Sequence, residues 1–206
     1  MEEYILNHLE PEPEYLKILT RKTFVRLING RMVSGHLQGR FLKMICRMIN
    51  PQNVLEIGTF TGYSALCLAE GLSGNSHIDT IEIDDELEDF ISENLKNSPF
   101  ENKITLHIGD ALKIIPNLDK IFDLAFIDGD KRQYINYFEC VFPKICKGGF
   151  ILVDNTLWNG KVIKPLERGD TQTRAILAFN DFISNDKRIE QVLLPLRDGL
   201  TIIRKI

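Results

Sequence analysis

The chain has 206 residues, of which 44% are hydrophobic and 26% charged, and its formal net charge at pH 7 is −4. This length suits one folded domain with a full core, and the composition excludes a disordered or fibrous protein. No apolar run reaches the roughly 18 residues of a membrane span, and the N-terminal MEEYILNHLE lacks the basic head of a signal peptide. We therefore expect a cytoplasmic protein without a membrane segment.

The predicted elements follow one another in a regular order. The first 50 residues are predicted to be helical, because 15–28 and 37–49 carry apolar residues three and four positions apart. Strands are predicted at 53–57, 78–83, 103–108, 121–127 and 149–153, with helices between them. After a loop at 155–170 come a helix near 171–184 and two strands, 189–194 and 199–204, which a turn at Pro195–Gly199 would join as a hairpin.

This alternation predicts an α/β fold, a doubly wound and mostly parallel sheet with helices on both faces. No repeat, low-complexity tract or linker interrupts the chain, so we expect a single domain over 1–206. The four cysteines, Cys46, Cys67, Cys140 and Cys146, have no Cys-x-x-Cys spacing, and the four histidines form no zinc pair. Reduced core cysteines are the simplest interpretation.

The segment Val54–Ser64, VLEIGTFTGYS, predicts a buried strand, a glycine turn and a helix. Such a unit places a small molecule at the carboxyl end of a parallel strand. A dinucleotide fingerprint needs GxGxxG, whereas Gly58 and Gly62 here read GxxxG with the bulky Phe60 between them. The spacing therefore favours an adenosine-like ligand without a pyrophosphate, and S-adenosylmethionine fits that description.

An acidic residue follows at the end of the second predicted strand. Glu82 lies about 20 residues beyond the glycine turn, where a carboxylate can accept hydrogen bonds from both ribose hydroxyls. The alternative is a solvated strand end. The neighbouring Asp84, Asp85 and Glu86 are expected to open the next helix, where acids favour the positive end of the helix dipole.

Polar residues also follow the fourth and fifth predicted strands. Asp128 ends the first of these strands, and Asp154 and Asn155 end the second. Neighbouring parallel strands would bring the three side chains together, as an all-oxygen ligand set suited to Mg²⁺ or Ca²⁺. For either aspartate alone, capping of the next helix would be the simpler interpretation. Lys131, three residues after Asp128, is a candidate general base, although a lone lysine is more often solvated.

Several motifs together resemble a known family. The segments MVSGHLQG, EIGTFTGYS, IDGDKRQY, LVDNTLWNGKV and the C-terminal PLRDGLTI are similar to those of cation-dependent class I O-methyltransferases. This is the catechol and caffeoyl-coenzyme A group, and its small bacterial members in particular. The resemblance implies a Rossmann-like sheet of seven strands with the last antiparallel, and a homodimer. It implies Asp128, Asp154 and Asn155 as metal ligands and Lys131 as base. The cofactor contacts that it implies are Met32, Val33, Glu56, Gly58, Tyr63, Ser64, Glu82, Asp110, Ala111 and Asp128.

The chemistry expected from these parts is methylation of a metal-chelated phenol, with Mg²⁺, Ca²⁺ or Mn²⁺ as the cation. Trp158 could stack on the aromatic ring or simply anchor its loop, and Met32 and Val33 could cover the cofactor or pack between helices. The glutamate that helps hold the catechol in the animal enzymes has no match within 170–180, so substrate identity does not transfer.

Two acceptors remain open: a small vicinal-dihydroxy aromatic, which we favour, and 5-hydroxyuridine in tRNA. The RNA alternative rests on residues 15–55, which contain eight Lys or Arg and no acid, whereas 1–14 contain five glutamates. A solvated helix face that pairs with acids of the same or a partner chain is the simpler interpretation of that basic block. A dehydrogenase is disfavoured because the pyrophosphate glycines are missing, and a cofactor-binding module without activity is a further alternative.

Overall fold

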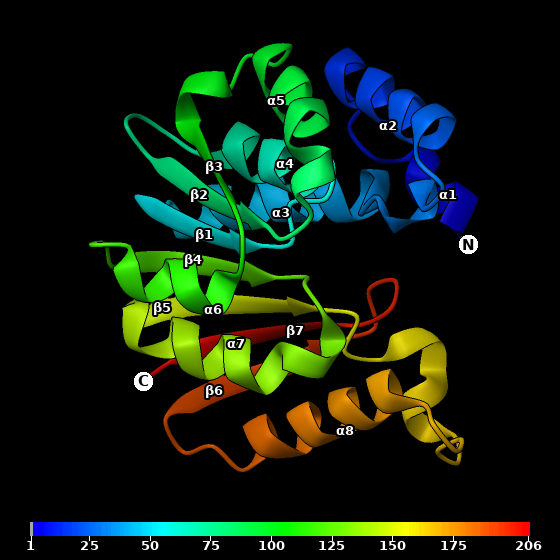
Figure 1. Ribbon diagram of the computed structural model, residues 1–206, viewed down its shortest axis with the longest axis vertical. Coiled ribbons are helices and arrows are strands. Elements are labelled where there is room, and N and C mark those ends of the chain that lie inside the picture. Colours follow the sequence, from blue (N-terminus) through cyan, green and yellow to red (C-terminus); the bar gives the residue numbers. More distant parts are fainter. Residues whose placement is uncertain (1) are drawn as a thin grey trace. The chain divides into compact units, whose positions relative to one another are not determined.

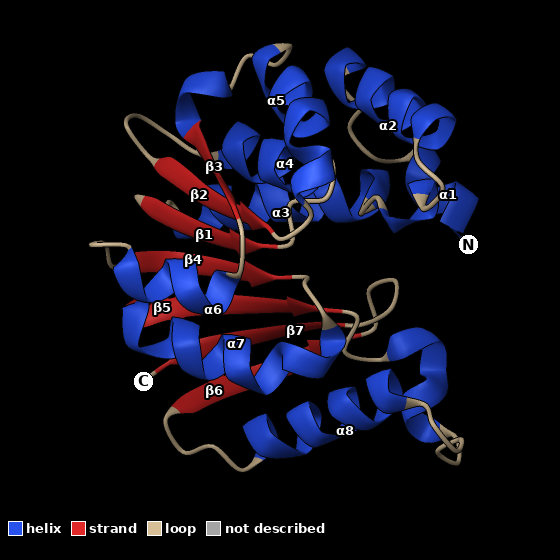
Figure 2. Ribbon diagram, viewed as in Figure 1, coloured by secondary structure: helices blue, strands red, loops and turns tan. Residues whose placement is uncertain are grey.

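The computed structural model describes residues 2–206, apart from the side chain of Glu2. The helices are α1 (Glu2–Asn7), α2 (Glu14–Arg26), α3 (Gly35–Ile49), α4 (Tyr63–Gly71), α5 (Glu88–Lys96), α6 (Ala111–Ile114), α7 (Tyr134–Val141) and α8 (Thr171–Ser184). The strands are β1 (Asn53–Ile57), β2 (His77–Glu82), β3 (Ile104–Ile108), β4 (Phe122–Ile127), β5 (Ile145–Asp154), β6 (Ile189–Leu194) and β7 (Leu200–Lys205). Figures 1 and 2 show these elements along the chain.

The seven strands form one sheet in the order β3-β2-β1-β4-β5-β7-β6. The pairs β2–β3, β1–β4 and β4–β5 are parallel, and β7 runs antiparallel to both β5 and β6. The predicted α/β fold and the closing hairpin are therefore confirmed. The strands at the centre of the order are apolar and almost completely buried, as expected for a parallel sheet covered on both faces.

The predicted boundaries hold to within two residues except at β5, which begins at Ile145 rather than at 149. Gly148 and Gly149 favour a turn, yet they lie inside the strand. Phe122 of β4 pairs with Ile145 of β5, with a register irregularity between Phe122 and Leu124. Pairing with β4 thus extends β5 through a segment whose local sequence favours a break.

The contacts within the chain define two compact units. The first comprises the chain up to Gln52 together with Thr59–Gly109, and the second comprises Asn53–Gly58 together with Asp110–Ile206. The expectation of a single domain stays a prediction. Within residues 2–206, no helix is both long and apolar enough to cross a membrane.

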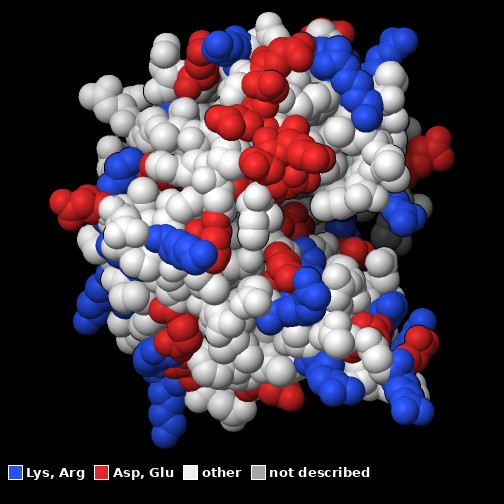
Figure 3. Space-filling model, in the orientation of Figure 1, with Lys and Arg blue, Asp and Glu red and all other residues white. Residues whose placement is uncertain are grey.

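In the first unit, the basic residues of α2 and α3 pair largely with acids of the same unit. Lys22 and Arg26 both reach Glu93 of α5, at 2.7 and 3.4 Å. Arg40 and Lys43 reach Glu70 of α4, at 2.6 and 2.8 Å. Figure 3 shows the acidic surface over α5 next to basic side chains of α2. The pairing with acids expected for the basic block is confirmed for these four residues, but Arg40 and Lys43 are largely buried and not solvated.

In the second unit, aromatic side chains fix α7 against α8, which lie side by side in Figure 1. The rings of Tyr134 and Phe179 meet edge to face at 5.5 Å, and Phe138 meets Phe179 and Phe182 in the same manner. Tyr134, Phe138 and Phe179 are at most 1% exposed. These contacts anchor both helices beside the short 3-10 turn Lys131–Gln133 that follows β4.

Candidate active site

The glycine turn of the first unit is a tight loop that opens directly into α4. Gly62 N donates to the Thr59 carbonyl at 2.9 Å, and Leu66 N donates to the Gly62 carbonyl at 3.0 Å. Phe60 and Gly62 both have positive φ, at 50° and 89°. Gly62 adopts this conformation without strain, whereas Phe60 must be held in it by its surroundings.

Glu82 supplies that support. Its carboxylate is buried and accepts from Phe60 N at 2.7 Å, from Ile83 N at 2.9 Å and from Asp84 N at 3.0 Å. A carboxylate has about four acceptor positions, so this arrangement leaves room for roughly one further donor. The solvated strand end considered for Glu82 is therefore wrong, and its contact with a ribose stays a prediction.

The acids that follow Glu82 open the next helix, as predicted. The Asp84 side chain accepts from Glu86 N at 3.1 Å, at the start of a 3-10 turn, Asp85–Leu87, which leads into α5. From α5, the buried Asn94 reaches back to the glycine turn and donates to the Thr61 carbonyl at 3.2 Å. The glycine turn is thus held by β2 on one side and by α5 on another.

The other cofactor candidates of this unit lie before α3 and in the first turn of α4. Met32 is 57% exposed, whereas Val33 and Ser64 are buried. Tyr63 is also buried, and its hydroxyl donates to Glu12 at 2.5 Å. The hydrogen bond between the Tyr63 hydroxyl and Glu12 connects the segment before α2 with the first turn of α4. Its predicted cofactor contact is not tested.

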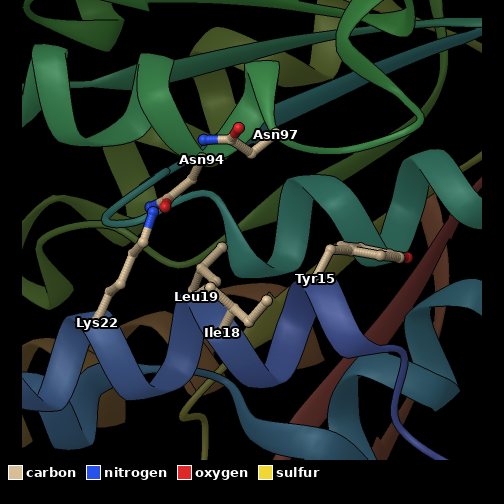
Figure 4. A pocket seen from close by; sticks show the side chains of 6 residues that line it. All are labelled: Tyr15, Ile18, Leu19, Lys22, Asn94 and Asn97. Carbon is tan, nitrogen blue, oxygen red and sulfur yellow. The ribbon is translucent and has the colours of Figure 1, made fainter.

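A groove of about 360 Å³ lies between α2 and α5, lined by Tyr15, Ile18, Leu19, Lys22, Asn94 and Asn97 (Figure 4). Its main donors are already engaged: Lys22 pairs with Glu93, and Asn97 donates to the Glu93 carbonyl at 2.8 Å. Asn94 donates to Thr61, as described above. The groove therefore presents few free donors to a ligand.

In the second unit, four predicted cofactor residues lie in or just after β1 and at the start of α6. Glu56 is fully buried in β1, opposite Phe126 of β4. Gly58 follows β1 with φ 97°, and a Cβ on it would overlap the Asp128 carbonyl. Asp110 caps α6 by accepting from Leu112 N at 3.0 Å, and Ala111 is buried behind it. These placements leave the predicted contacts untested.

The predicted metal ligands lie at the ends of two paired strands. Ile127 of β4 pairs with Val153 of β5, so Asp128 and Asp154 occupy matching positions at one edge of the sheet. Asp154 is 3% exposed, and its carboxylate accepts from Asn155 N at 2.8 Å. Within the described residues no three His, Cys, Asp or Glu side chains form a metal-binding group. The predicted set of metal ligands is not a group of this kind, because its third member is the amide of Asn155.

Lys131 lies next to this cluster. Its Nζ donates to Asp128 Oδ1 at 2.7 Å and lies 5.3 Å from the centre of the Tyr134 ring. Both side chains of the ion pair are largely buried, Lys131 at 12% and Asp128 at 21% exposed. Lys131 therefore lies in contact with Asp128. Its predicted role as a general base is not tested.

Tyr134 is a member of this cluster that sequence reasoning missed. Its hydroxyl donates to the backbone carbonyl of Asp154 at 2.9 Å. Complete burial, followed by the charges of Asp128 and Asp154, raises the pKa of this phenol well above its ordinary value. Tyr134 therefore stays a protonated donor. Two sequence signals could have indicated it: Tyr134 is the last residue of the segment IDGDKRQY, and it follows Lys131 by three positions.

Trp158 is half-buried in the loop after β5, with φ 46°. Its backbone N donates to the carbonyls of Asp198 at 3.0 Å and Asn155 at 3.1 Å. These bonds make the Trp158 backbone an anchor of the loop that carries Asn155. The stacking of its ring on a substrate is not tested.

Comparison with known proteins adds independent evidence. A family model described as O-methyltransferase matches residues 7–206. Caffeoyl-CoA O-methyltransferase 2 of Populus trichocarpa is 34% identical over 209 residues, covering 95% of this chain and 83% of that protein. The SAH-bound structure of Podospora anserina methyltransferase PaMTH1 matches with a TM-score of 0.91 and 28% identity, over 100% of this chain and 93% of that one. The SAH complex of a Bacillus cereus O-methyltransferase matches with a TM-score of 0.89 and 25% identity, over 99% and 96% of the two chains.

Proposed function

Because this chain belongs to the O-methyltransferase family, we propose that it transfers the methyl group of S-adenosylmethionine to a hydroxyl of a small vicinal-dihydroxy aromatic molecule, with the help of a divalent cation. The observation that carries the proposal is the cluster of Asp128, Asp154 and Asn155 at the ends of β4 and β5. The family match supports the methyl transfer, and this cluster supports the choice of acceptor.

The donor set fits a hard cation. Two carboxylates and one amide oxygen suit Mg²⁺, Mn²⁺ or Ca²⁺ and offer neither nitrogen nor sulfur to Zn²⁺. Lys131 Nζ already lies against Asp128 Oδ1 at 2.7 Å, which supports the proposal that this oxygen binds a cation. A divalent cation held by these residues would favour the ionised form of a chelated phenol, whose pKa in water is about 10.

The chain's own residues supply the remaining chemistry. Lys131 is proposed to take the proton of the acceptor hydroxyl, because its Nζ lies beside the proposed cation ligand Asp128, at 2.7 Å from Oδ1. Tyr134 holds the backbone of Asp154 in place, since its hydroxyl donates to the Asp154 carbonyl. Trp158 is proposed to contact the aromatic ring of the acceptor.

The cofactor is proposed to bind at the glycine turn. Glu82 keeps an acceptor position for a ribose hydroxyl while it holds Phe60 N. The family resemblance implies the remaining contacts of the proposed set, which are Met32, Val33, Glu56, Gly58, Tyr63, Ser64, Asp110, Ala111 and Asp128. The SAH complexes of the Podospora and Bacillus proteins, which match over nearly the whole chain, support this part of the proposal.

A hydroxylated nucleoside of tRNA is the second candidate acceptor, because the basic block could contact phosphates. Lys22, Arg26, Arg40 and Lys43 are engaged by acids of their own unit. Arg21 and Arg31 make no ion pair within residues 2–206. The pairing of Lys22, Arg26, Arg40 and Lys43 favours the small-molecule acceptor. The family resemblance is also the basis for proposing a homodimer.

The test measures methyl transfer to a catechol, to a caffeoyl ester and to undermodified tRNA, with and without EDTA. We expect turnover of the small diols, its loss in EDTA and its recovery on addition of Mg²⁺ or Mn²⁺. Asp154→Ala should be inactive but folded, whereas the exposed Asp119→Ala should match the wild type. Full activity in EDTA together with an active Asp154→Ala would remove the cation from the mechanism.

The two acceptors are distinguished by salt and by charge. Each phosphate that a protein contacts releases counterions, so methylation of RNA should fall steeply with salt. Changing Arg21, Lys22 and Arg26 together to Gln should leave catechol turnover nearly unchanged. A salt-sensitive activity that is confined to tRNA and lost in this triple variant would replace the small diol by RNA as the acceptor.

A further inference from the structure

The backbone of Asn155 has an unusual conformation for a residue other than glycine. Its φ is 57°, and Trp158 and Asn159 of the same loop also have positive φ, at 46° and 52°. Residues with a Cβ are uncommon in this left-handed region; asparagine enters it more readily than most, whereas a bulky residue such as Trp158 remains there only when the surrounding structure holds it. The loop after β5 must therefore be held by contacts from elsewhere in the chain.

The next residue, Thr156, shows what holds it. Its carbonyl accepts from Asn180 Nδ2 of α8 at 2.8 Å, and its hydroxyl oxygen accepts from the Thr201 hydroxyl of β7 at 2.9 Å. Its backbone N donates to the Gly199 carbonyl at 3.1 Å. All three polar groups of Thr156 are thus bound, each by a different element, and both threonines are completely buried.

The turn between β6 and β7 adds a second set of contacts to this loop. Leu157 N donates to the Asp198 carbonyl at 2.7 Å. Gly199 has φ 90°, and a Cβ there would lie 2.5 Å from Leu157 N, so only glycine allows this approach. The loop therefore lies directly against the turn Pro195–Gly199.

These contacts leave the backbone of Asn155 little freedom. Its own N donates to Asp154 Oδ1, and its carbonyl accepts from Trp158 N. Thr156, its neighbour on the other side, is bound as described. Asn180 Oδ1 is buried without a hydrogen-bond partner among the described residues. The amide of Asn180 therefore acts on the loop through the bond from its Nδ2 to the Thr156 carbonyl.

We propose that Asn180 and Thr201 are positioning residues that hold Thr156, and through it keep Asn155 in the left-handed conformation in which its amide serves as a cation ligand. This inference rests on the cation site of the proposed function. Neither residue is proposed to touch the cation. Partners that orient metal ligands typically change metal affinity by about 10- to 100-fold when they are removed.

The test measures binding of Mn²⁺ alone to the full chain by electron paramagnetic resonance, so it needs neither acceptor nor turnover. Asn180→Ala and Thr201→Val should each weaken Mn²⁺ binding about 10- to 100-fold. Thr201→Ser keeps the hydroxyl and should bind like the wild type. Asn185→Ala removes an exposed amide just after the same helix, one that donates to the Asp181 carbonyl, and should also bind like the wild type.

Two further measurements on each variant distinguish a general loss of structure from a specific effect on the cation site. They are the circular dichroism spectrum and the affinity for S-adenosylhomocysteine. Both should be unchanged in Thr201→Val. If folded Asn180→Ala and Thr201→Val bind Mn²⁺ as tightly as the wild type while Asn155→Ala does not, the positioning role is wrong and the cation site stands. If the wild type binds no Mn²⁺, or if Asn155→Ala binds it equally well, the cation site itself fails and the positioning role fails with it.

Discussion

Gly58 and Asp128 meet backbone to backbone where β1 and β4 end, so closely that a Cβ on Gly58 would overlap the carbonyl oxygen of Asp128. The contact continues the strand pairing, because Asp128 N donates to the Ile57 carbonyl at 2.8 Å. The proposed cation ligand Asp128 is therefore held in register with the first glycine of the turn. A glycine at this position serves the packing of two strand ends as well as the turn itself.

Gly58→Ala tests this contact. We expect a loss of about 3 kcal/mol or more in the free energy of unfolding, because the new methyl adds a clash to a φ of 97°. Gly74→Ala is the matched control, since Gly74 also has a positive φ but open space around its missing Cβ, and it should cost about 1 kcal/mol. Urea denaturation of both variants gives the comparison, and equal losses would show that the Asp128 contact is unimportant.

Glu82→Ala should weaken binding of S-adenosylmethionine by about 1.5–3 kcal/mol, the usual value of hydrogen bonds to a charged group. The variant loses the proposed ribose contact and also the acceptor that holds Phe60 N. Isothermal titration calorimetry measures the effect, with the exposed Glu86→Ala as control. Unchanged affinity in Glu82→Ala would contradict the assignment of Glu82, and tight binding of NAD by the wild type would contradict the cofactor class.

Lys131→Arg and Lys131→Met separate a base from a charge. An arginine can keep an ion pair with Asp128 but cannot give up its proton, so both variants should lower kcat by about 10²- to 10⁴-fold. Cofactor affinity should change little in either variant. Steady-state kinetics with a catechol provides the measurement, and the exposed Lys147→Met is the control. If Lys131→Arg retains full turnover, Lys131 acts through its charge and another group takes the proton.

Glu70 should make stability depend on pH. Burial raises the pKa of its carboxyl, but hydrogen bonds from Arg40 and Lys43 outweigh burial and lower it to about 2, from 4.5. A carboxyl with a lowered pKa stabilises the fold fully above pH 4.5, and its contribution disappears as the pH falls toward 2.

The difference in unfolding free energy between wild type and Glu70→Gln should therefore shrink by up to about 3 kcal/mol between pH 6 and pH 2.5. Urea denaturation at several pH values measures this difference. The exposed Glu101→Gln should show no such trend. A difference for Glu70→Gln that stays constant over this range would mean that the ion pair with Arg40 does not set the pKa.

Most of the fold could be predicted from local patterns. The bounds of the apolar strands and of the periodic helices agree with the structure to within two residues. They do so because the spacing of apolar residues within a segment indicates both the type of element and its extent. The exception is β5, which begins at Ile145 and not at the predicted position 149. Pairing of Ile145 with Phe122, 23 positions earlier in the chain, decided that boundary, and no local signal reports such a pairing.

The sequence by itself determined which polar residues end the parallel strands, and hence that Asp128, Asp154 and Asn155 would lie at one edge of the sheet. It could do so because strand register follows from alternation and chain order. Only the tertiary structure decided what holds them. Tyr134 reaches the Asp154 carbonyl, and Asn180 and Thr201 reach Thr156, from 20 to 45 positions away. Hydrogen bonds over such separations depend on how helices pack against strands, and spacing within any one segment does not encode that packing.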